Sequence, residues 1–159
     1  MKNKRNALIS MCLLGIPCRY NATPSPALIS AEIFIKYNLI PVCPEQLGGL
    51  ATPRPPAEIQ SGDGSNILLK TADVININND NVTDNFISGA KQTLLLARKF
   101  NIECFIGQAR SPSCSCCEIY NGTFTGKLKL GLGVTAALLK QNGIETIEPQ
   151  TSKAGSKKV

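Results

Sequence analysis

The stretch Ala-Leu-Ile-Ser-Met-Cys at residues 7–12 is the starting point for the fold, because it joins a short apolar run to a cysteine. Its first four residues have the length and apolar character of a buried strand. Similar runs occur at 39–42 and 102–106, and helical patterns separate them along the chain. Short apolar strands that alternate with amphipathic helices are typical of a mostly parallel sheet flanked by helices. The sequence therefore predicts an α/β fold.

Helix and turn signals organise the rest of the chain. Residues 44–66 are rich in glycine and proline and are expected to hold no long element, whereas 66–76 is predicted to be a short hairpin or a strand pair. A last strand is predicted at 144–147. The predicted helices are 26–36 with Ser25 as N-cap, 83–100 with Thr83 as cap, and 135–141, which ends before Asn142-Gly143.

Length and charge indicate one domain with two basic ends. A chain of 159 residues is long enough for one ordinary core and too short for two. Six of the seventeen lysines and arginines lie in 1–5 and 149–159, where there is no acidic residue, so 6–148 carries eleven basic and eleven acidic residues. We therefore expect basic tails at 1–5 and 149–159 around a single domain at 6–148. A neutral body argues against dedicated nucleic-acid binding.

The N-terminus imitates a secretory signal, because basic residues precede the apolar run 7–16. The run ends at Ile16-Pro17-Cys18, which is a poor cleavage site, and it is too short to span a bilayer. Seven cysteines are also an odd number, which a pure disulfide framework would not leave. These features predict a cytoplasmic protein with no membrane partner.

The chain contains no histidine, and this excludes several mechanisms. Ser/His/Asp triads, Cys/His pairs and histidine-ligated zinc sites all require an imidazole. Catalysis in this protein therefore depends on thiolates, carboxylates or hydroxyl groups.

Three cysteines are predicted to meet at one edge of the sheet. Cys12 follows the first strand, Cys43 ends the second, and Cys114 lies in the loop after the third. Ligands of open parallel sheets bind beyond the carboxyl ends of the strands, and converging thiolates favour zinc, copper(I) or an iron–sulfur cluster. Three thiolates on a four-iron cluster would leave one iron without a protein ligand. Separate buried thiols are the alternative, and Cys18 is either a fourth ligand or a neighbour of the site.

Other apparent motifs carry less information. Cys104 lies inside a predicted strand and is interpreted as a core residue, and the single C-x-x-C at 114–117 lacks the second pair of a typical zinc site. The run Gly-Leu-Gly-Val-Thr-Ala at 131–136 resembles a dinucleotide-binding turn but lies too near the C-terminus, so we interpret it as a turn that leads into a helix. Arg54, held between two prolines near Glu58, either faces the cleft or forms a salt bridge in its loop.

Five motifs resemble, in the same order, those of the thiouracil desulfidase (TudS) family, and the similarity runs from about residue 6 to 148. The motifs are Leu-Ile-Ser-Met-Cys-Leu-Leu-Gly at 8–15 with Cys-Arg-Tyr at 18–20, Pro-Val-Cys-Pro-Glu at 41–45 with Gly-Gly-Leu at 48–50, Thr-Pro-Arg-Pro-Pro-Ala-Glu-Ile at 52–59, Ser-Pro-Ser-Cys at 111–114, and Ile-Tyr-Asn-Gly-Thr-Phe at 119–124.

The resemblance implies a cytoplasmic α/β enzyme with an oxygen-sensitive [4Fe-4S] cluster, loaded by the iron–sulfur assembly machinery. The implied reaction removes sulfur from a small thiolated pyrimidine such as 2-thiouracil without net redox change, giving uracil and hydrogen sulfide. The residues implied are the cluster ligands Cys12, Cys43 and Cys114, with Cys18 as an alternative to Cys12, the acid/base pair Glu45 and Ser111, and the substrate-binding residues Arg19, Tyr20, Arg54 and Ser113.

One position departs from the family pattern. The family has a glycine after Ser-Pro-Ser-Cys, whereas this chain has Ser115, followed by Cys116 and Cys117. The added Cβ of Ser115 stands where the backbone would approach the cluster closely, and the two thiols are possible competing ligands. The alternative function is accordingly a non-catalytic thiolate metal-binding module or an iron–sulfur sensor.

Overall fold

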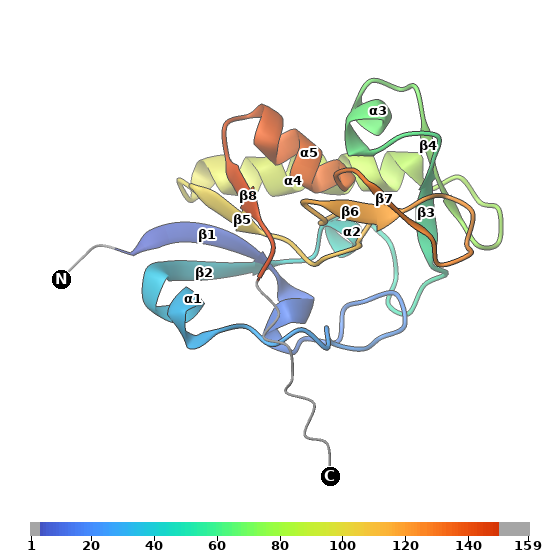
Figure 1. Cartoon of the computed structure of the whole chain (residues 1–159). Coiled ribbons are helices and arrows are strands. Elements are labelled where there is room, and N and C mark those ends of the chain that lie inside the picture. The colour runs from blue at the N-terminus through green and yellow to red at the C-terminus, as the bar shows by residue number, and fades with distance from the viewer. Residues whose placement is uncertain (1–3, 150–159) are drawn as a thin grey trace, which may run out of the picture.

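Four parallel strands form the central sheet of the computed structural model, which describes residues 4–149 (Figure 1). The strand order is β2-β1-β5-β8, so the first strand of the chain lies inside the sheet. The register aligns the strand ends, with Ser10 beside Val42 and Ile9 beside Ile106. The predicted α/β fold is confirmed. The strands are β1 (Arg5–Ser10), β2 (Tyr37–Val42), β5 (Cys104–Ile106) and β8 (Glu145–Ile147).

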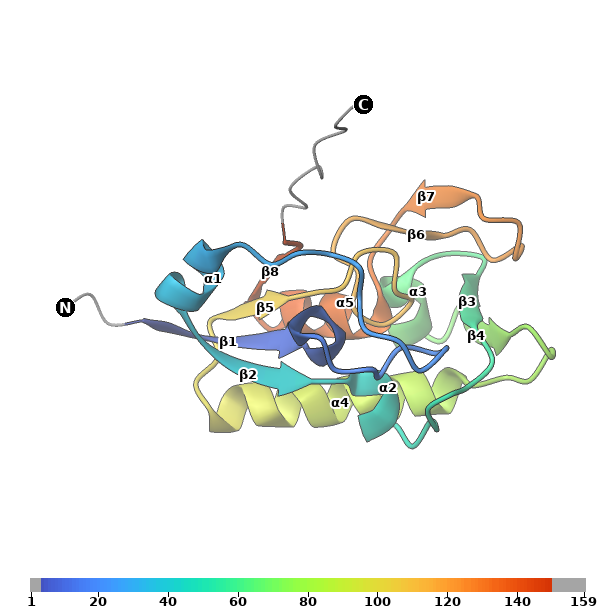
Figure 2. The ribbon, with the colours of Figure 1, turned by 90° about the horizontal axis from the view of Figure 1, so that it is seen from below.

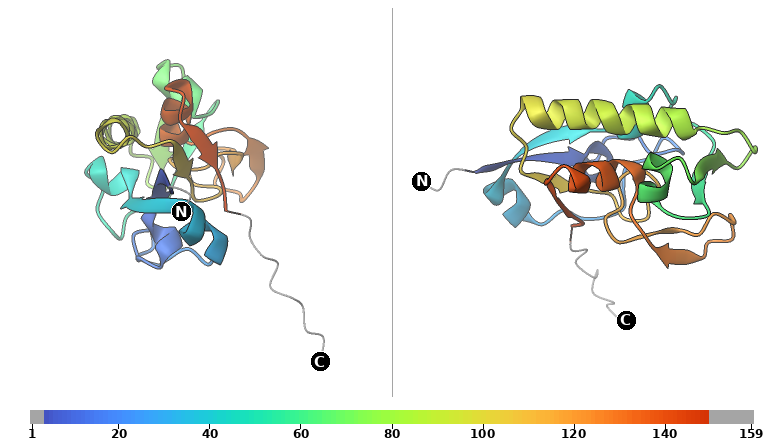
Figure 3. Two further views of the ribbon diagram at one scale, coloured as in Figure 1. Left: turned by 90° about the vertical axis from the view of Figure 1, so that its left-hand side faces the viewer. Right: turned by 90° about the horizontal axis from the view of Figure 1, so that it is seen from above.

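Helices cover the two faces of this sheet unequally (Figures 2 and 3). The long helix α4 (Thr83–Lys99) and α5 (Val134–Gln141) pack on one face, and the short elements η1 (Met11–Leu14) and α1 (Ala31–Lys36) lie on the other. The middle of strand β1 is buried on both faces, which explains the apolar run at residues 7–9.

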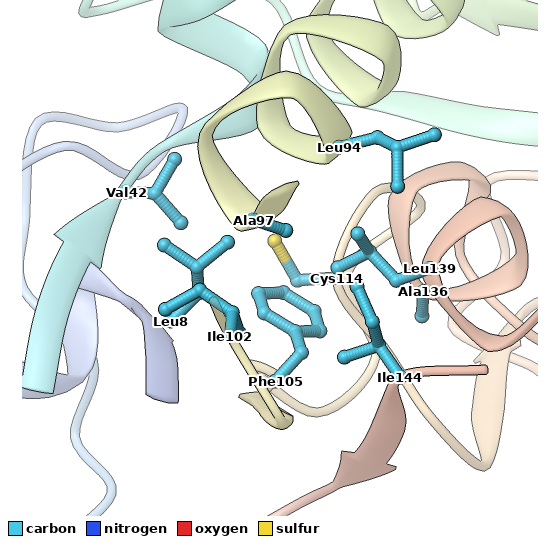
Figure 4. Close-up of a cluster of buried hydrophobic side chains, with 10 residues drawn as sticks. All are labelled: Leu8, Val42, Leu94, Ala97, Ile102, Phe105, Cys114, Ala136, Leu139 and Ile144. Carbon is cyan, nitrogen blue, oxygen red and sulfur yellow. The ribbon is translucent and has the colours of Figure 1, made fainter. Parts of the chain in front are cut away.

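The side chains of β1 divide between two apolar clusters. Leu8 packs with Phe105 under α4 and α5 (Figure 4), and Ala7 and Ile9 pack on the opposite face with Cys104. Cys104 is fully buried, as predicted for a core residue. The first cluster also contains Cys114, so that cysteine belongs to the core as well as to the edge of the sheet.

Two small antiparallel pairs and two short helices lie beyond the carboxyl ends of the parallel strands (Figures 1 and 3). Strand β3, helix α2 and strand β6 contribute to the walls of the region where the predicted cysteines lie. The pairs are β3 (Ala57–Gln60) with β4 (Asp73–Asn76) and β6 (Glu118–Tyr120) with β7 (Leu128–Leu130), and the helices are α2 (Pro44–Leu47) and α3 (Gly64–Leu68).

The predicted helix start at Ser25-Pro26 is wrong, because α1 begins only at Ala31. The backbone N–H of Ser25 donates to the carbonyl of Cys12 at 2.9 Å, and its hydroxyl accepts the N–H of Ala27 at 3.1 Å. These bonds fix the segment as a loop against η1.

Other predictions are also corrected by the structure. The expected hairpin at 66–76 is the end of α3 followed by β4, whose partner is β3 in the segment where no long element was expected. Thr83 is the first residue of α4, and its hydroxyl accepts the N–H of Val74 at 2.9 Å in place of capping the helix. The run 131–136 does lead into a helix, α5.

The N-terminal tail is shorter than predicted. Arg5, which was expected in the tail, is the first residue of β1 and forms salt bridges with Glu103 and Glu145 at 3.2 and 2.8 Å. Residues 1–3 and the predicted C-terminal tail from 150 onward lie outside the described residues. None of the helices within 4–149 combines the length and apolar character needed to cross a bilayer.

Candidate active site

A cavity of about 490 Å³ opens beyond the carboxyl ends of β1, β2 and β5. This volume is in the usual range for a small-molecule site. The cavity brings together residues from all five sequence motifs on which the functional prediction rests. Of the predicted site residues, the lining contains Cys12, Cys18, Arg19, Tyr20, Cys43, Glu45, Arg54, Ser111 and Cys114.

The strand ends explain how the four thiols meet. Cys12 lies in η1 directly after β1, Cys43 stands between β2 and α2, and Cys114 lies in the loop after β5. Cys18 follows η1, and its backbone carbonyl accepts the Cys43 thiol at 3.9 Å. Three of these residues are buried and Cys43 is half-buried, so the thiols form the floor of the cavity.

The surroundings of Cys18, Cys43 and Cys114 disfavour the ionised form of these three thiols. The neighbouring Cys12 thiol is the largest cause that raises the pKa of Cys18 to about 11. The Cys18 thiol, followed by burial, raises the pKa of Cys43, and burial raises that of Cys114 against the opposing hydrogen bonds of Ser10 and Ser111. Metal binding at these thiols must therefore release protons.

The donor set fits an iron–sulfur cluster. All seven cysteines are free of disulfides, and four of them line one cavity. Thiolates select soft metals and iron–sulfur clusters, and a [4Fe-4S] cluster distributes its ligands over separate irons. Within residues 4–149 no three His, Cys, Asp or Glu side chains gather closely enough to hold a single metal ion.

Glu45 is fixed by a buried ion pair. It lies in the first turn of α2, and its Oε2 accepts the Nε of Arg54 at 2.6 Å, with side chains only 15 and 7 % exposed. The Nη1 of Arg54 also donates to the carbonyls of Cys18 and Ala51 and to the Thr52 hydroxyl at 3.0–3.2 Å. Arg54 therefore both lines the cavity and forms a salt bridge, with Glu45 as its partner.

The hydroxyl of Ser111 has a fixed hydrogen-bonding direction. Its Oγ accepts the backbone N–H groups of Ser113 and Cys114 at 3.2 and 3.1 Å. Two acceptor bonds occupy both lone pairs of a hydroxyl oxygen, which leaves its proton to be donated. Ser111 is thus oriented as a donor toward the cavity that it lines and toward the Cys114 sulfur.

Ser113 occupies a core position. It is 1 % exposed, and its hydroxyl shares a hydrogen bond of 2.9 Å with that of Thr135 in α5. Ser113 is not one of the described residues that line the cavity. The structure thus gives it a role in joining the cysteine loop to the helix.

A carboxylate binds the residues that follow Cys114 in the loop after β5. Glu148, directly after β8, accepts the Ser115 hydroxyl at 2.8 Å and the backbone N–H of Cys116 at 2.7 Å on the same oxygen. Ser115, which departs from the expected glycine, is fully buried, and the carbonyl of Glu118 at 2.5 Å is a second acceptor within reach of its hydroxyl.

The two extra thiols lie away from the four that line the cavity. The Cys116 thiol donates to the carbonyls of Cys114 and Ile147 at 3.5 Å, and burial is the largest cause that raises its pKa to about 12. Cys117 is exposed, and within the described residues neither thiol belongs to the lining. Gly107 completes this packing, because a Cβ there would collide with the carbonyl of Cys114.

Among the lining residues that received no role from the sequence, five have charged, amide or aromatic side chains. They come from β3, the loop after β5, strand β6 and the β6–β7 connection. Glu58, Tyr120 and Phe124 lie in the motifs quoted above, and this position in a motif could have marked them as candidate site residues. The residues are Glu58, Gln108, Arg110, Tyr120 and Phe124.

Comparison with known proteins defines the class of this fold and site. The family model for 2-thiouracil desulfurase matches residues 7–150, and the chain belongs to this family. The resemblance seen in the sequence is thereby confirmed.

Two relatives illustrate the match. The chain is 44 % identical over 140 residues to the uncharacterized protein YbbK of Bacillus subtilis (strain 168), which covers 88 % of this chain and 93 % of that protein. The structure of the present chain resembles that of the [4Fe-4S]-dependent thiouracil desulfidase TudS, with a TM-score of 0.79, 34 % identity and 91 % of each chain covered.

Proposed function

We propose that the protein is a [4Fe-4S]-dependent desulfidase that removes sulfur from 2-thiouracil or a related small thiolated molecule and releases hydrogen sulfide. The observation that carries the proposal is the convergence of four thiols, Glu45 and Ser111 on one cavity. Membership of the 2-thiouracil desulfurase family and the likeness to TudS support it.

Cys12, Cys43 and Cys114 would hold the cluster, because they follow the three parallel strands whose ends meet at the cavity. When bound through three cysteines, such a cluster supplies a Lewis-acidic iron without a protein ligand, and this soft metal suits a thiocarbonyl sulfur. Cys18 lies beside Cys12 and Cys43 and is assigned as a neighbour of the ligands.

Glu45 is assigned as the general base that takes a proton from the attacking water. Its carboxylate lines the cavity, and Arg54 fixes its orientation through Oε2. A general base must lie within hydrogen-bond reach of its proton, and a side chain tied at one oxygen presents the other in a defined direction.

Ser111 is assigned as the donor that protonates the departing sulfur. Its two backbone partners occupy the lone pairs of the hydroxyl oxygen, so the hydroxyl is oriented to donate its proton. Water adds to the thiocarbonyl carbon and gives one proton to Glu45. The C–S bond breaks as Ser111 gives its proton to sulfur, the added hydroxyl gives the second proton of hydrogen sulfide, and its oxygen stays on the ring. The proton held by Glu45 then restores the Ser111 hydroxyl. The oxygenated ring and hydrogen sulfide leave, and no electron is gained or lost overall.

The test is anaerobic reconstitution with iron and sulfide, followed by assay of hydrogen sulfide and uracil from 2-thiouracil. We expect brown protein and equal amounts of the two products. Colourless protein that carries zinc, or brown protein that releases no sulfide, would instead favour the non-catalytic alternative.

A further inference from the structure

Glu58 is a second carboxylate of the cavity, and the mechanism above does not use it. It lies in β3, lines the same cavity as Glu45, and is only 8 % exposed. Its Oε2 accepts the backbone N–H groups of Gly122 and Phe124 at 2.9 and 3.0 Å. A buried carboxylate therefore connects β3 to the turn after β6.

These two bonds hold the turn in an unfavourable backbone conformation. Phe124 has a φ of 55°, in the left-handed region that costs a non-glycine residue about 1–2 kcal/mol. Gly122 has a φ of 91°, and a Cβ there would lie 2.6 Å from the carbonyl oxygen of Ile59. Because Glu58 fixes the turn, Tyr120 and Phe124 keep their places in the cavity wall.

The other carboxylate oxygen of Glu58 is available to a ligand. Within residues 4–149, Oε1 takes part in no protein hydrogen bond, whereas Oε2 makes two. Oε1 is not fully enclosed by protein. Within the described residues, the Tyr37 hydroxyl is the one fully buried side-chain polar atom that lacks a hydrogen-bond partner. An ionised carboxylate accepts hydrogen bonds and cannot donate them. The cavity therefore presents an acceptor that calls for an N–H or O–H group.

We infer that Glu58 is a specificity residue that accepts a ring N–H of the bound heterocycle, beside the aromatic wall formed by Tyr120 and Phe124. This inference rests on the proposed function for the nature of the ligand. The substrate class is a flat ring that carries an N–H next to its thiocarbonyl carbon. A ring alkylated at that nitrogen would leave the acceptor unpaired, and sites built around a hydrogen bond reject such analogues strongly.

The informative variant is Glu58→Gln. The glutamine oxygen can still accept the N–H groups of Gly122 and Phe124, while the second position becomes an NH₂ donor that faces the ring N–H. Binding of uracil to the reconstituted protein, measured by calorimetry, should weaken at least about tenfold, the lower range for a hydrogen bond to a charged group. Glu32→Gln, which removes an exposed carboxylate from α1, is the matched control and should bind uracil as the unaltered protein does.

The ligand series 1-methyluracil, 3-methyluracil and 1,3-dimethyluracil gives a second measurement that does not depend on the variant. The unaltered protein should bind the dimethyl ring at least about tenfold more weakly than uracil, and Glu58→Gln should lose this discrimination. Equal affinity of the unaltered protein for the two rings, or equal uracil affinity in the variant, would overturn the inference.

Uracil binding needs no turnover, so the two proposals fail in different ways. A protein that binds uracil as described but releases no sulfide from 2-thiouracil contradicts the proposed reaction and supports the role of Glu58. A protein that releases sulfide but ignores ring methylation supports the reaction and contradicts that role.

Discussion

Replacing Arg54 by methionine should strongly destabilise the fold, because its partner would remain as a buried charge. The Arg54–Glu45 pair has side chains 7 and 15 % exposed and an N–O distance of 2.6 Å. Removing one partner of a buried ion pair lowers the free energy of unfolding by about 3–5 kcal/mol. Methionine keeps most of the apolar stem of arginine, so the loss reports the charge and not the packing. For a chain of this size each kcal/mol corresponds to about 2–4 °C in Tm, so we expect a fall of roughly 6–20 °C.

The assay is thermal unfolding followed by circular dichroism on anaerobically reconstituted protein. Arg5→Met is the matched control, because Arg5 forms two ion pairs whose side chains are 35–56 % exposed. Exposed ion pairs contribute little to stability, so the Tm of the control should fall much less than that of Arg54→Met. Equal falls in the two variants would show that the Arg54 pair is no stronger than a surface pair and would refute the reasoning.

Four further outcomes are expected from the roles assigned above. Cys43→Ala should lose both the brown colour and sulfide release; a brown and active variant would contradict the ligand set. Glu45→Gln should keep the colour but lose at least about a hundredfold in turnover, as for removal of a general base, and an unchanged rate would remove it from the mechanism. Cys116→Ser and Cys117→Ser should each retain the cluster colour, because neither thiol lines the cavity; loss of colour in either would restore it as a ligand. Glu148→Ala should speed iron loss to a chelator severalfold, whereas Glu148→Gln, which keeps an acceptor oxygen, should stay near the unaltered rate.

The strand-end rule was sufficient to predict where the site lies. Cys12, Cys43 and Cys114 are far apart in sequence, but each follows a short apolar run, and parallel strands place such positions at one edge. The motif resemblance added Glu45 and Ser111, which the structure brings to the same cavity.

Local signals failed where distant contacts decide the conformation. Ser25 has the sequence signature of a helix start, but its backbone N–H bonds to Cys12, and this contact fixes a loop. Strand β3 is four residues long and follows several prolines, and it exists because β4 pairs with it across α3. The Ser113 hydroxyl, which the resemblance assigned to substrate binding, is hydrogen-bonded to that of Thr135 in the core. No short window of sequence contains both partners of these contacts.

The strand order has a consequence for biosynthesis. Strand β1 leaves the ribosome first but lies inside the sheet, and its neighbour β5 is made only after α4. A nascent chain therefore presents Cys12 and Cys43 long before Cys114 and Ser111 exist to face them. Pairing of such distant strands is slow compared with local folding. If the three cysteines hold the proposed cluster together, complete ligation would follow translation of the chain through Cys114 and closure of the β1–β5 pair.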